Sequence, residues 1–543
     1  MKTLLLNAPA EDLLARKDRA PSRELAVGAR VFGSTFVQAL LTYGSWDSYC
    51  FLKGTEASVR SRSRTAPVDR VRFLHTQPHT EIAALDRPVI SANGPVLQEL
   101  RLLRRCYAPR CDWPITGFIH SIHDKSPPLW ILSLVLGDMR PWDALICSST
   151  AGRRVIENYL DALVDAYPGV AGLDPLPRPS LPVMPLGTEA IERDEARRST
   201  ARHRLGVEND AVVLLYVGRF SPTSKCDLVP LLTAFADATR DSRPRARLVL
   251  AGDDTGHNMA AGLRAAAAQF GCGDVVTVCP NPTHSEKIDL FNAADVFVSP
   301  SDNVQETFGL TVIEALSAGL PVIASDWNGY RDLLSQGETG FLVPTYWTDL
   351  GPTFDELTLS TGLFNDGTIP ATTVIDTGLL RSYIELLVRD ADRRAAIGAN
   401  ARRVFHERFH WPVVIRQYES LWDELRARAK RDAASYQTGS SDVRGVLRNT
   451  FGHYPSEVLA DSSEVMVAAA DRWDALCTAG NGLPGLPLPA LVTRTALDEL
   501  ASIPSMTIGD AVCRLRSHAG TEFAARLIAA RLLKCGVLER VHR

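Results

Sequence analysis

Long apolar stretches are missing from this sequence of 543 residues. No run approaches the roughly 18 apolar residues that a membrane-spanning helix needs. The first residues, MKTLLLNAPAEDLL, include the acidic residues Glu11 and Asp12. The apolar stretch before them is too short for the apolar core of a signal peptide, which is about 7–15 residues long. We therefore expect a soluble cytoplasmic protein and leave peripheral contact with a membrane open.

Closely spaced cysteine pairs are also missing. The ten cysteines are scattered from Cys50 to Cys535 and include no C-x-x-C pair, whereas structural zinc sites use closely spaced thiols. We expect reduced thiols and assign no metal and no cofactor.

Neither sign of charge dominates the chain. Lys and Arg together number 59 and Asp and Glu 63, which gives a net charge of -4 and no general basic surface for nucleic acid. Residues 438–543 hold eleven basic and eleven acidic side chains, so this segment has no basic footprint for DNA either. Any anion site must be local, and we expect no nucleic-acid partner.

Short apolar runs alternate with helical patterns after residue 210. They are AVVLLYV (211–217), ARLVLAG (246–252), DVVTV (274–278), DVFVS (295–299), PVIAS (321–325) and GFLV (340–343). This alternation is typical of a parallel sheet with helices on both faces. Such sheets bind ligands at the carboxyl ends of their strands.

A weaker version of the same alternation comes earlier. Its runs are VRFLH (71–75), PITGFIH (114–120), DALICSS (143–149) and PVMPLG (182–187). They predict a first α/β domain, and a chain of this length has room for about three domains.

The pattern changes after residue 344. Residues 345–377 are rich in Gly, Thr, Asp and Pro, as in a loop or insertion. Helical spacing returns at 379–409 and 413–430, and again at 523–541.

The densest pattern runs from Val298 to Thr345. It predicts a helix that begins near Phe308 and Gly309 and ends at Gly319, with Pro321 just beyond. The helix start should face the crevice at the strand ends. Unpaired amides and the positive end of the helix dipole make it suitable for a phosphate.

Two acidic residues, Glu306 and Glu314, flank this helix start at a spacing of eight residues. That spacing puts them roughly 10 Å or more apart, beyond the about 5–9.5 Å between the carboxylates of glycosidases. They fit better with the two ends of one elongated ligand, whose phosphate lies at the helix start, with sugar hydroxyls at Glu306 and ribose hydroxyls at Glu314. Such a ligand is a nucleotide diphosphate sugar.

The segment resembles the donor site of the retaining family-four glycosyltransferases, whose E-x7-E motif matches Glu306 and Glu314. The specific pattern is E-T-F-G-L-x-x-x-E-A-x-x-x-G-x-P-V-I-A-S. The resemblance covers roughly residues 25–430 and implies a two-domain GT-B fold with the active site in the cleft between the domains. It also implies that the sugar and diphosphate meet the amides of Phe308, Gly309, Leu310 and Thr311.

Two basic residues lie in VGRFSPTSK, directly after an apolar run: Arg219 and Lys225. Their charges would neutralise a leaving diphosphate, an effect of several kcal/mol in a dry cleft. The resembling enzymes carry an Arg and a Lys in a G-R-x(n)-K-G pattern. Here Cys226 and Asp227 follow the lysine instead.

Two weaker candidates come from the first domain. FIHSIHD places His120 and His123 at a predicted strand end, and the resemblance implies a histidine near the donor sugar, for which we favour His120. Gly33, in RVFGSTFVQALL, sits before a predicted helix and resembles a glycine loop that approaches the diphosphate or acceptor. Phe32 stands where a second glycine is usual.

Each of these residues also has a structural alternative. The two histidines could lie satisfied in the core, Gly33 could start a helix, and the acidic and basic candidates could cap a helix or form surface ion pairs. Three further groups are open in the same way: Trp327 and Tyr330 (cleft lining or packing), Asp302 and Asn303 (a turn before the donor loop), and Arg60, Arg62, Arg64, Arg70 and Arg72 (a solvated loop or an anion site).

We predict an α/β protein with two Rossmann-like domains and a mainly helical C-terminal extension. The ranges are 1–188 for the acceptor-side domain, 189–380 for the donor domain, 381–433 for helices that pack back across both, and 434–543 for a helical accessory domain.

The expected reaction is a retaining, metal-independent transfer of a sugar from a UDP- or GDP-sugar, or a similar donor, to an unidentified acceptor hydroxyl. Open alternatives are a phosphorylase or epimerase of the same fold, and a non-catalytic sugar-nucleotide-binding protein with a partner-binding C-terminal module. A homo-oligomer also stays open.

Overall fold

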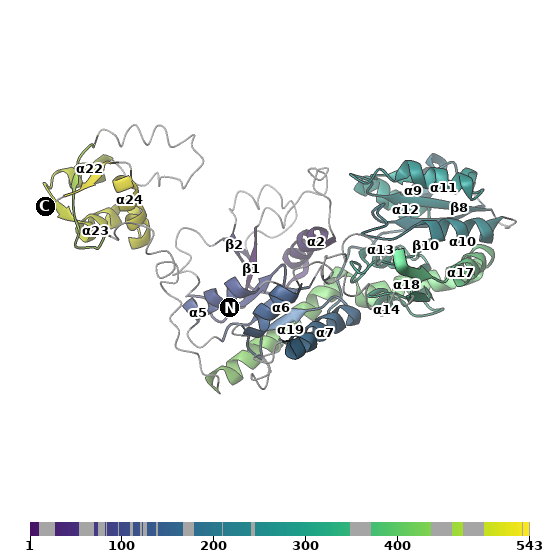
Figure 1. The fold of residues 1–543 in the computed structure, drawn as a ribbon, viewed down its shortest axis with the longest axis horizontal. Coiled ribbons are helices and arrows are strands. Elements are labelled where there is room, and N and C mark those ends of the chain that lie inside the picture. Colours follow the sequence, from purple (N-terminus) through teal and green to yellow (C-terminus); the bar gives the residue numbers. More distant parts are fainter. Residues whose placement is uncertain are drawn as a thin grey trace. The chain divides into compact units, whose positions relative to one another are not determined.

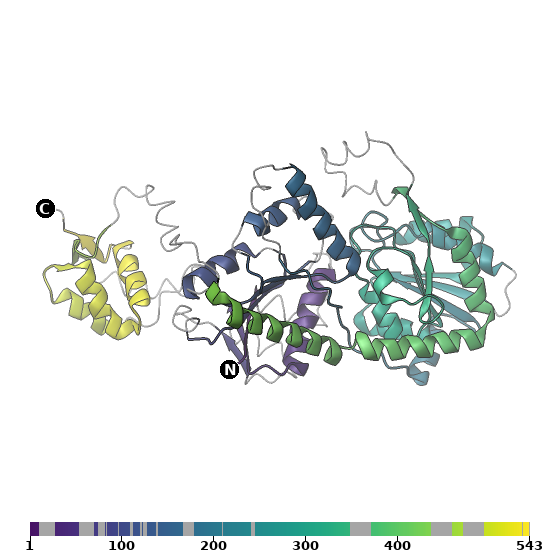
Figure 2. The ribbon, with the colours of Figure 1, turned by 90° about the horizontal axis from the view of Figure 1, so that it is seen from below.

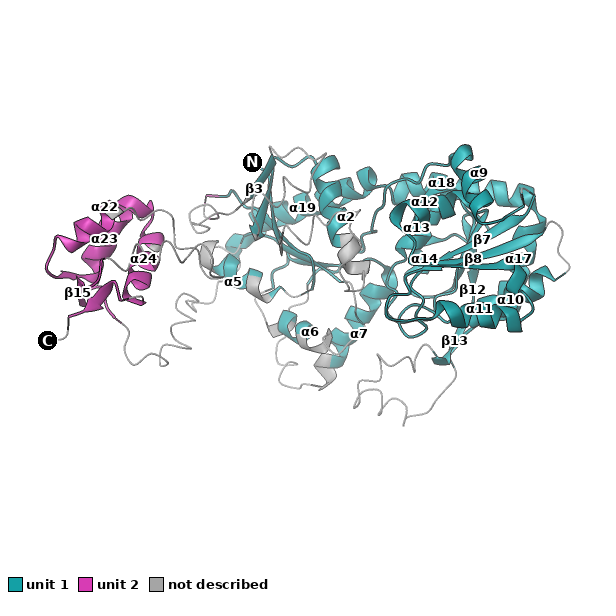
Figure 3. Cartoon of the chain, turned by 90° about the horizontal axis from the view of Figure 1, so that it is seen from above, with its two compact units in different colours: residues 1–73, 85–438 teal, residues 74–84, 439–543 magenta. Residues whose placement is uncertain are grey.

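The computed structural model divides the chain into two compact units (Figure 3). Unit 1 comprises residues 1–73 and 85–438, and unit 2 comprises residues 74–84 and 439–543. The residues described are 1–9, 28–53, 70–73, 82, 84–95, 97–108, 112–119, 122, 127–136, 139–166, 179–208, 210–240, 245–347, 371–435, 459–470, 494–534 and 536–541.

Unit 1 begins with a parallel sheet, which forms the centre of its first domain. The strands are β1 (Thr3–Pro9), β2 (Ser48–Lys53), β3 (Val71–Phe73), β4 (Val89–Ala92), β5 (Ile115–Phe118) and β6 (Ala144–Ile146). Their order is β3-β2-β1-β4-β5-β6, so the strand order reverses between β1 and β4, as in Rossmann folds. The helices of this domain are α2 (Gly28–Tyr43), α5 (Gln98–Tyr107), α6 (Pro127–Leu136) and α7 (Thr150–Ala166).

Two predictions for the first domain are wrong. The run PVMPLG forms only an isolated bridge between Val183 and Cys147, because Pro182 and Pro185 cannot donate to a strand ladder. Gly33 lies inside α2, which already begins at Gly28, and does not precede a helix. A Cβ atom at Gly33 would come within 2.5 Å of the Asn93 side chain, so glycine allows α2 to approach the residues after β4 closely.

The second domain of unit 1 contains the six strands predicted after residue 210. They are β7 (Val212–Val217), β8 (Ala246–Gly252), β9 (Val276–Pro280), β10 (Val296–Ser299), β11 (Val322–Ser325) and β12 (Gly340–Val343). The order β12-β11-β10-β7-β8-β9 reverses between β7 and β10, which pair in parallel. Every residue of β7, β10 and β11 is buried, as expected for strands covered on both faces.

Helices cover both faces of this second sheet (Figures 1 and 2). They are α9 (Glu195–Arg204), α10 (Val229–Thr239), α11 (Ala260–Gln269), the short 3-10 helix Gly273–Val275, α12 (His284–Ala293), α13 (Leu310–Ser317), α14 (Tyr330–Leu333), α17 (Thr377–Arg389) and α18 (Ala391–Arg408). Where a loop was predicted, β13 (Thr345–Trp347) and β14 (Thr373–Ile375) pair antiparallel. The residues between these two strands lie outside the described part of the chain.

The long helix α19 (Trp411–Asp432) returns from the second domain to the first (Figure 2) and ends in the 3-10 turn Ala433–Ser435. Its buried Glu419 accepts hydrogen bonds from the Ser45 amide at 2.6 Å and the Ser45 hydroxyl at 2.8 Å. The rings of Tyr418 and Phe36, the latter on α2, lie 5.0 Å apart. The helix therefore belongs to the core of the first domain.

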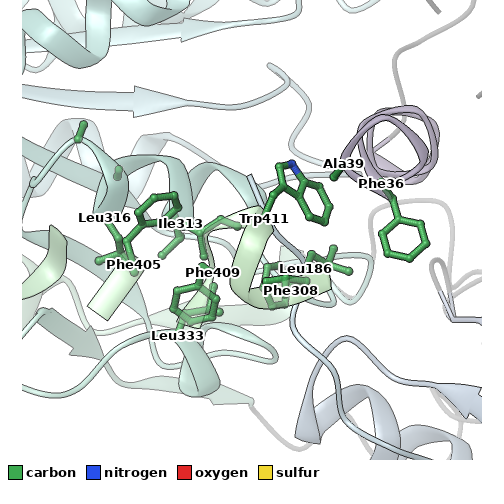
Figure 4. Close-up of a cluster of buried hydrophobic side chains, with 14 of the residues drawn as sticks. Phe36, Ala39, Leu186, Phe308, Ile313, Leu316, Leu333, Phe405, Phe409 and Trp411 are labelled. Carbon is green, nitrogen blue, oxygen red and sulfur yellow. The ribbon is translucent and has the colours of Figure 1, made fainter. Parts of the chain in front are cut away.

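One hydrophobic cluster extends through both domains of unit 1 (Figure 4). It connects Phe36 on α2 with Trp411 at the start of α19, and continues to Phe409 and Phe308. Ile313 and Leu316 of α13 bury their side chains in the same cluster. The loop and helix with the predicted donor residues therefore rest on packing that both domains share.

Unit 2 combines helices with a small antiparallel sheet. Its elements are β15 (Glu464–Val467), α22 (Arg494–Ala501), β16 (Met506–Thr507), α23 (Ile508–Ala519), α24 (Glu522–Lys534) and β17 (Leu538–Arg540), with strand order β16-β15-β17. The helices agree with the mainly helical extension, but the sheet was not predicted. The helix predicted over 523–541 ends at Lys534, where Gly536 turns the chain with a φ of +67°.

None of the described helices is both long and apolar enough to cross a membrane.

Truncation of Trp422 tests how strongly α19 holds the first domain. The Trp422 side chain is fully buried, and its ring lies 5.6 Å from that of Trp46 and 6.4 Å from that of Phe36. Trp422→Ala should lower the free energy of unfolding by about 3–5 kcal/mol, measured by urea denaturation of the full chain. Ser420→Ala, on the exposed side of the same helix, should change it by less than about 0.5 kcal/mol. Equal small losses in both variants would contradict this role for α19.

Candidate functional site

The candidate site lies where the strand order of the second sheet reverses. The loop from Gly218 to Leu228 follows β7, and the loop from Pro300 to Gly309 follows β10. β7 and β10 are neighbours in the sheet, so both loops leave it side by side. In open parallel sheets this reversal point is the place where ligands bind.

Hydrogen bonds join the two loops into one structure. The Ser301 hydroxyl donates to the Lys225 carbonyl at 3.1 Å, and the Asn303 amide donates to the Thr223 carbonyl at 2.5 Å. A carboxylate oxygen of Asp302 accepts from the Asp227 amide at 3.1 Å. Asp302 and Asn303 therefore hold the β7 loop in place, beyond the turn predicted for them.

The two loops bring Lys225 and Glu306 together as an ion pair. Only 12% of the Lys225 side chain and 15% of the Glu306 side chain are exposed. Burial by itself would lower the pKa of Lys225, but the charge and hydrogen bond of Glu306 outweigh it and raise that pKa above its ordinary value. Lys225 therefore keeps its charge, and the ion pair holds both side chains in place.

Arg219 reaches from the β7 loop toward the β10 loop. Its guanidinium donates to the Ser224 carbonyl at 2.9 Å and to the Gln305 side chain at 3.3 Å. A second fixed positive charge thus lies on the same pair of loops as Lys225.

The helix that follows, α13, begins and ends as the sequence predicts. Its N-cap residue is Gly309, with a φ of +115° and no side chain to cap the first turn, and Gly319 follows its end with a φ of +68°. The first amides of a helix have no partner within the helix. The hydroxyl of Thr311 is buried and finds no hydrogen-bond partner among the described residues. The start of α13 therefore presents polar groups that a ligand could satisfy.

Glu314, on α13, pairs with Lys287 of α12 at 2.7 Å. Only 19% of the Glu314 side chain is exposed, and the ammonium group of Lys287 offsets part of the cost of burying its carboxylate. Sequence reasoning missed Lys287. The lysine follows a capping box of Thr283 and Glu286, which predicts a helix start and says nothing about the partner of Lys287.

Tyr330 and Trp327 both contact the site. Tyr330 is fully buried, and its hydroxyl lies 2.7 Å from the Ser299 hydroxyl and 3.4 Å from a carboxylate oxygen of Glu306. The indole N–H of Trp327 donates to the Asn303 carbonyl at 3.0 Å. Both residues therefore support the β10 loop from the segment after β11.

The two domains of unit 1 touch beside this loop. The Ser148 hydroxyl of the first domain donates to the Thr307 carbonyl at 3.4 Å. The amide and hydroxyl of Thr150, at the start of α7, donate to the Asp332 carboxylate at 2.5 and 2.9 Å. A cavity of about 300 Å³ lies next to these contacts, and its lining includes Ser148, Val183, Phe308, Asp332, Phe409 and Gln417.

The remaining candidates fall into two groups. His120, His123, Arg60, Arg62 and Arg64 lie outside the described residues, whereas Gly33 and Arg70 are described and lie in the first domain. Gly33 packs against Asn93, beside the strand reversal of the first sheet. Arg70 donates to the Gly44 carbonyl at 2.7 Å and so supports the local backbone. Within the described ranges, no group of three or more His, Cys, Asp or Glu is placed to hold a metal ion.

The segment with both loops and α13 has recognisable relatives. Residues 197–361 match the family described as "Glycosyl transferases group 1". D-inositol 3-phosphate glycosyltransferase of Geodermatophilus obscurus is 39% identical over 199 residues, which are 35% of this chain and 42% of that protein. The protein of the same name from Thermobispora bispora is 34% identical over 244 residues, 44% of this chain and 48% of that protein. The matched stretch thus spans less than half the length of either relative.

A solved structure extends the likeness beyond this segment. Sucrose-phosphate synthase from Thermosynechococcus elongatus is 21% identical, with a TM-score of 0.53, over 79% of this chain and 100% of that chain. This likeness, with the two six-stranded parallel sheets, confirms the predicted pair of Rossmann-like domains in a GT-B arrangement.

Asp302 provides a test of the packing between the two loops. It is 2% exposed, and one of its carboxylate oxygens has no hydrogen-bond partner in the described part of the chain. Burial raises its pKa to about 7; the charge of Asp227 adds to the rise, and the Asp227 amide opposes it. A raised carboxyl pKa means that the folded state prefers the neutral form, so this group costs stability as the pH rises from about 4 to about 7.

Asp302→Asn should remove that cost while it keeps an acceptor for the Asp227 amide. The unfolding free energy of the variant, relative to the original chain, should rise by a few kcal/mol between acid and neutral pH and then level off. Chemical denaturation across this interval measures the difference. Asp237→Asn, at an exposed position on α10, is the control. If the unfolding free energies of all three proteins change in parallel with pH, the fold does not raise the pKa of Asp302.

Proposed function

We propose that this chain transfers a sugar, with retention of configuration, from a nucleotide diphosphate sugar to an acceptor hydroxyl. The observation that carries the proposal is the largely buried Lys225–Glu306 pair, held beside the uncapped start of α13 at the strand reversal. The match of residues 197–361 to the group 1 glycosyl transferases supports the reaction class.

In this proposal the diphosphate binds at the start of α13. The first-turn amides and the positive end of the helix dipole attract an anion, and Thr311 has a hydroxyl whose hydrogen-bonding capacity is unused in the described structure. Gly309 lets the phosphate approach the backbone because it has no Cβ. Arg219 and Lys225 supply positive charge from the neighbouring loop.

The two acidic residues take the two carbohydrate rings. When a phosphate binds the ammonium group of Lys225, a carboxylate oxygen of Glu306 can accept hydrogen bonds from the hydroxyls of the donor sugar. Glu314, oriented by Lys287, accepts hydrogen bonds from the ribose hydroxyls. Lys287 stays beside Glu314 and lowers the cost of burying that carboxylate.

Transfer then depends on stabilising the leaving diphosphate. Negative charge grows on it as the glycosidic bond breaks, and fixed cations in a cleft that excludes water stabilise that charge by several kcal/mol. Glu306 is paired with Lys225 and so is poorly suited to act as a nucleophile. We infer a front-side displacement, in which the acceptor hydroxyl attacks the face that the phosphate leaves and a phosphate oxygen takes up its proton.

Substitution of Glu306 and Arg219 tests the donor site. Glu306→Gln keeps an acceptor for Lys225 but removes the charge, and Arg219→Ala removes one cation. Each should lower kcat by about 100-fold or more, on the scale of losing one oxyanion donor, while circular dichroism shows an unchanged fold. A radiolabelled sugar nucleotide measures the rate, and glycoside formation distinguishes transfer from epimerisation.

The control is Glu338→Ala, at an exposed position beyond the site, which should keep the original rate. A panel of nucleotide diphosphates identifies the base by thermal shift, because a ligand at 100 times its Kd adds about 2.7 kcal/mol of stability. Original rates in both site variants would contradict the assignment.

We further propose that unit 2 recognises the acceptor. The loops after β7 and β10, here called the donor loops, both lie in unit 1. Truncation after Thr438 should therefore leave hydrolysis of the donor unchanged. Transfer to the acceptor should fall by about tenfold or more, equivalent to about 1.4 kcal/mol of lost binding. The two assays run on the same preparation measure this, with gel filtration to detect a change of oligomeric state. Unchanged transfer would exclude a role in acceptor recognition.

A further inference from the structure

We propose that Tyr330 is a positioning residue for the donor site: its hydroxyl holds Glu306 in place when Lys225 turns to the diphosphate, and its ring fixes the turn at Gly309. This inference rests on the function proposed above. The sequence pattern left Tyr330 open between cleft lining and packing, and the donor-site motif does not include it.

A single hydroxyl meets three polar groups from three parts of the chain. Tyr330 Oη lies 2.7 Å from Ser299 Oγ at the end of β10, 3.5 Å from Lys225 Nζ and 3.4 Å from Glu306 Oε2. A tyrosine hydroxyl has one hydrogen to donate and two lone pairs to accept with. The consistent assignment is that Lys225 and Ser299 donate to it, and that it donates to Glu306.

The ring of Tyr330 contacts the other half of the donor site. A Cβ atom placed on Gly309 would lie 2.4 Å from Cε1 of the Tyr330 ring, so the ring packs directly against the residue that begins α13. On the other side of the same contact, a Cβ atom on Gly329 would lie 2.3 Å from the Thr307 carbonyl. The start of α14 is therefore pressed against residues 307–309, and only glycines allow this approach.

The surroundings keep the hydroxyl protonated. Burial, together with the negative charge of Glu306, raises the pKa of Tyr330 above its ordinary value. Tyr330 therefore keeps its proton at neutral pH and can donate a hydrogen bond to Glu306.

The consequence appears when the donor binds. Lys225 is the principal partner of Glu306 in this structure, and a diphosphate at the start of α13 would compete for the same ammonium group. A buried carboxylate that loses its partner is costly and mobile. Tyr330 keeps one hydrogen bond on Glu306 during that exchange, so the other carboxylate oxygen stays directed to the sugar.

Tyr330→Phe isolates this role because it removes one oxygen atom and keeps the ring against Gly309. The matched control is Tyr418→Phe on α19, which is also fully buried and whose hydroxyl donates to the Pro185 carbonyl at 3.3 Å. Both variants lose one buried hydroxyl, but only the first loses a contact with the donor loops. A purely structural effect would be similar in the two.

The experiment uses the full chain and measures initial rates at varied donor concentration, with the thermal shifts caused by UDP and by GDP. Tyr330→Phe should lower kcat by about 10- to 100-fold, the value of a hydrogen bond to a charged group. Its nucleotide-induced thermal shift should match that of the original chain, because the diphosphate contacts remain. Tyr418→Phe should keep kcat within about twofold. A kcat within twofold of the original in Tyr330→Phe, or equal losses in both variants, would overturn the inference.

A double-mutant cycle separates this inference from the proposed function. The melting temperatures of Tyr330→Phe, Glu306→Gln and the double variant show whether the two groups interact, with no need for activity. If the changes in melting temperature are non-additive but the chain transfers no sugar, the proposed function is refuted. The contact between the Tyr330 hydroxyl and Glu306 is then still established. Additive changes would refute the positioning role whatever the chain catalyses.

Discussion

The site depends on the ion pair between Lys225 and Glu306, two charges held almost out of water between two loops. Removal of ions from water costs several kcal/mol each unless their geometry is fixed and their other hydrogen bonds are satisfied. The structure meets this requirement through neighbouring residues: Ser301 and Asn303 join the loops to each other, and Tyr330 touches both members of the pair. The loops must therefore move as one body.

The sheet topology explains why these two loops meet at all. Lys225 and Glu306 are far apart in the sequence, and they meet because β7 and β10 are adjacent where the strand order reverses. The helix after the second loop, α13, is anchored from below by Ile313 and Leu316 in the cluster shared by both domains (Figure 4). The start of this helix carries polar groups, among them the Thr311 hydroxyl, whereas Ile313 and Leu316 are apolar and buried. The packing of these two side chains fixes the direction in which the helix amides point.

Much of this arrangement follows from local sequence patterns. Continuous apolar runs predicted the six strands of the second sheet, and Gly309 and Gly319 predicted the limits of α13, because these signals depend only on neighbouring residues. The pairing of Glu314 with Lys287, and the contact of Tyr330 with Glu306, join segments distant in the chain, and no local pattern encodes them. The small sheet of unit 2 was missed because strands of two to four residues are too short to show a period. Gly33 was misplaced because helix α2 tolerates a glycine where Asn93 packs against it.

The carboxylate of Asp332 has a consequence for how unit 1 can open. It belongs to the second domain, yet it accepts hydrogen bonds from the backbone and the hydroxyl of Thr150 at the start of α7 in the first. A helix start is thus completed by a residue of another domain. Any rotation that widens this edge of the cleft must return that helix end to water, at a cost on the order of 1 kcal/mol. A contact of this size favours the arrangement seen in this structure, yet it is small enough for thermal motion to break.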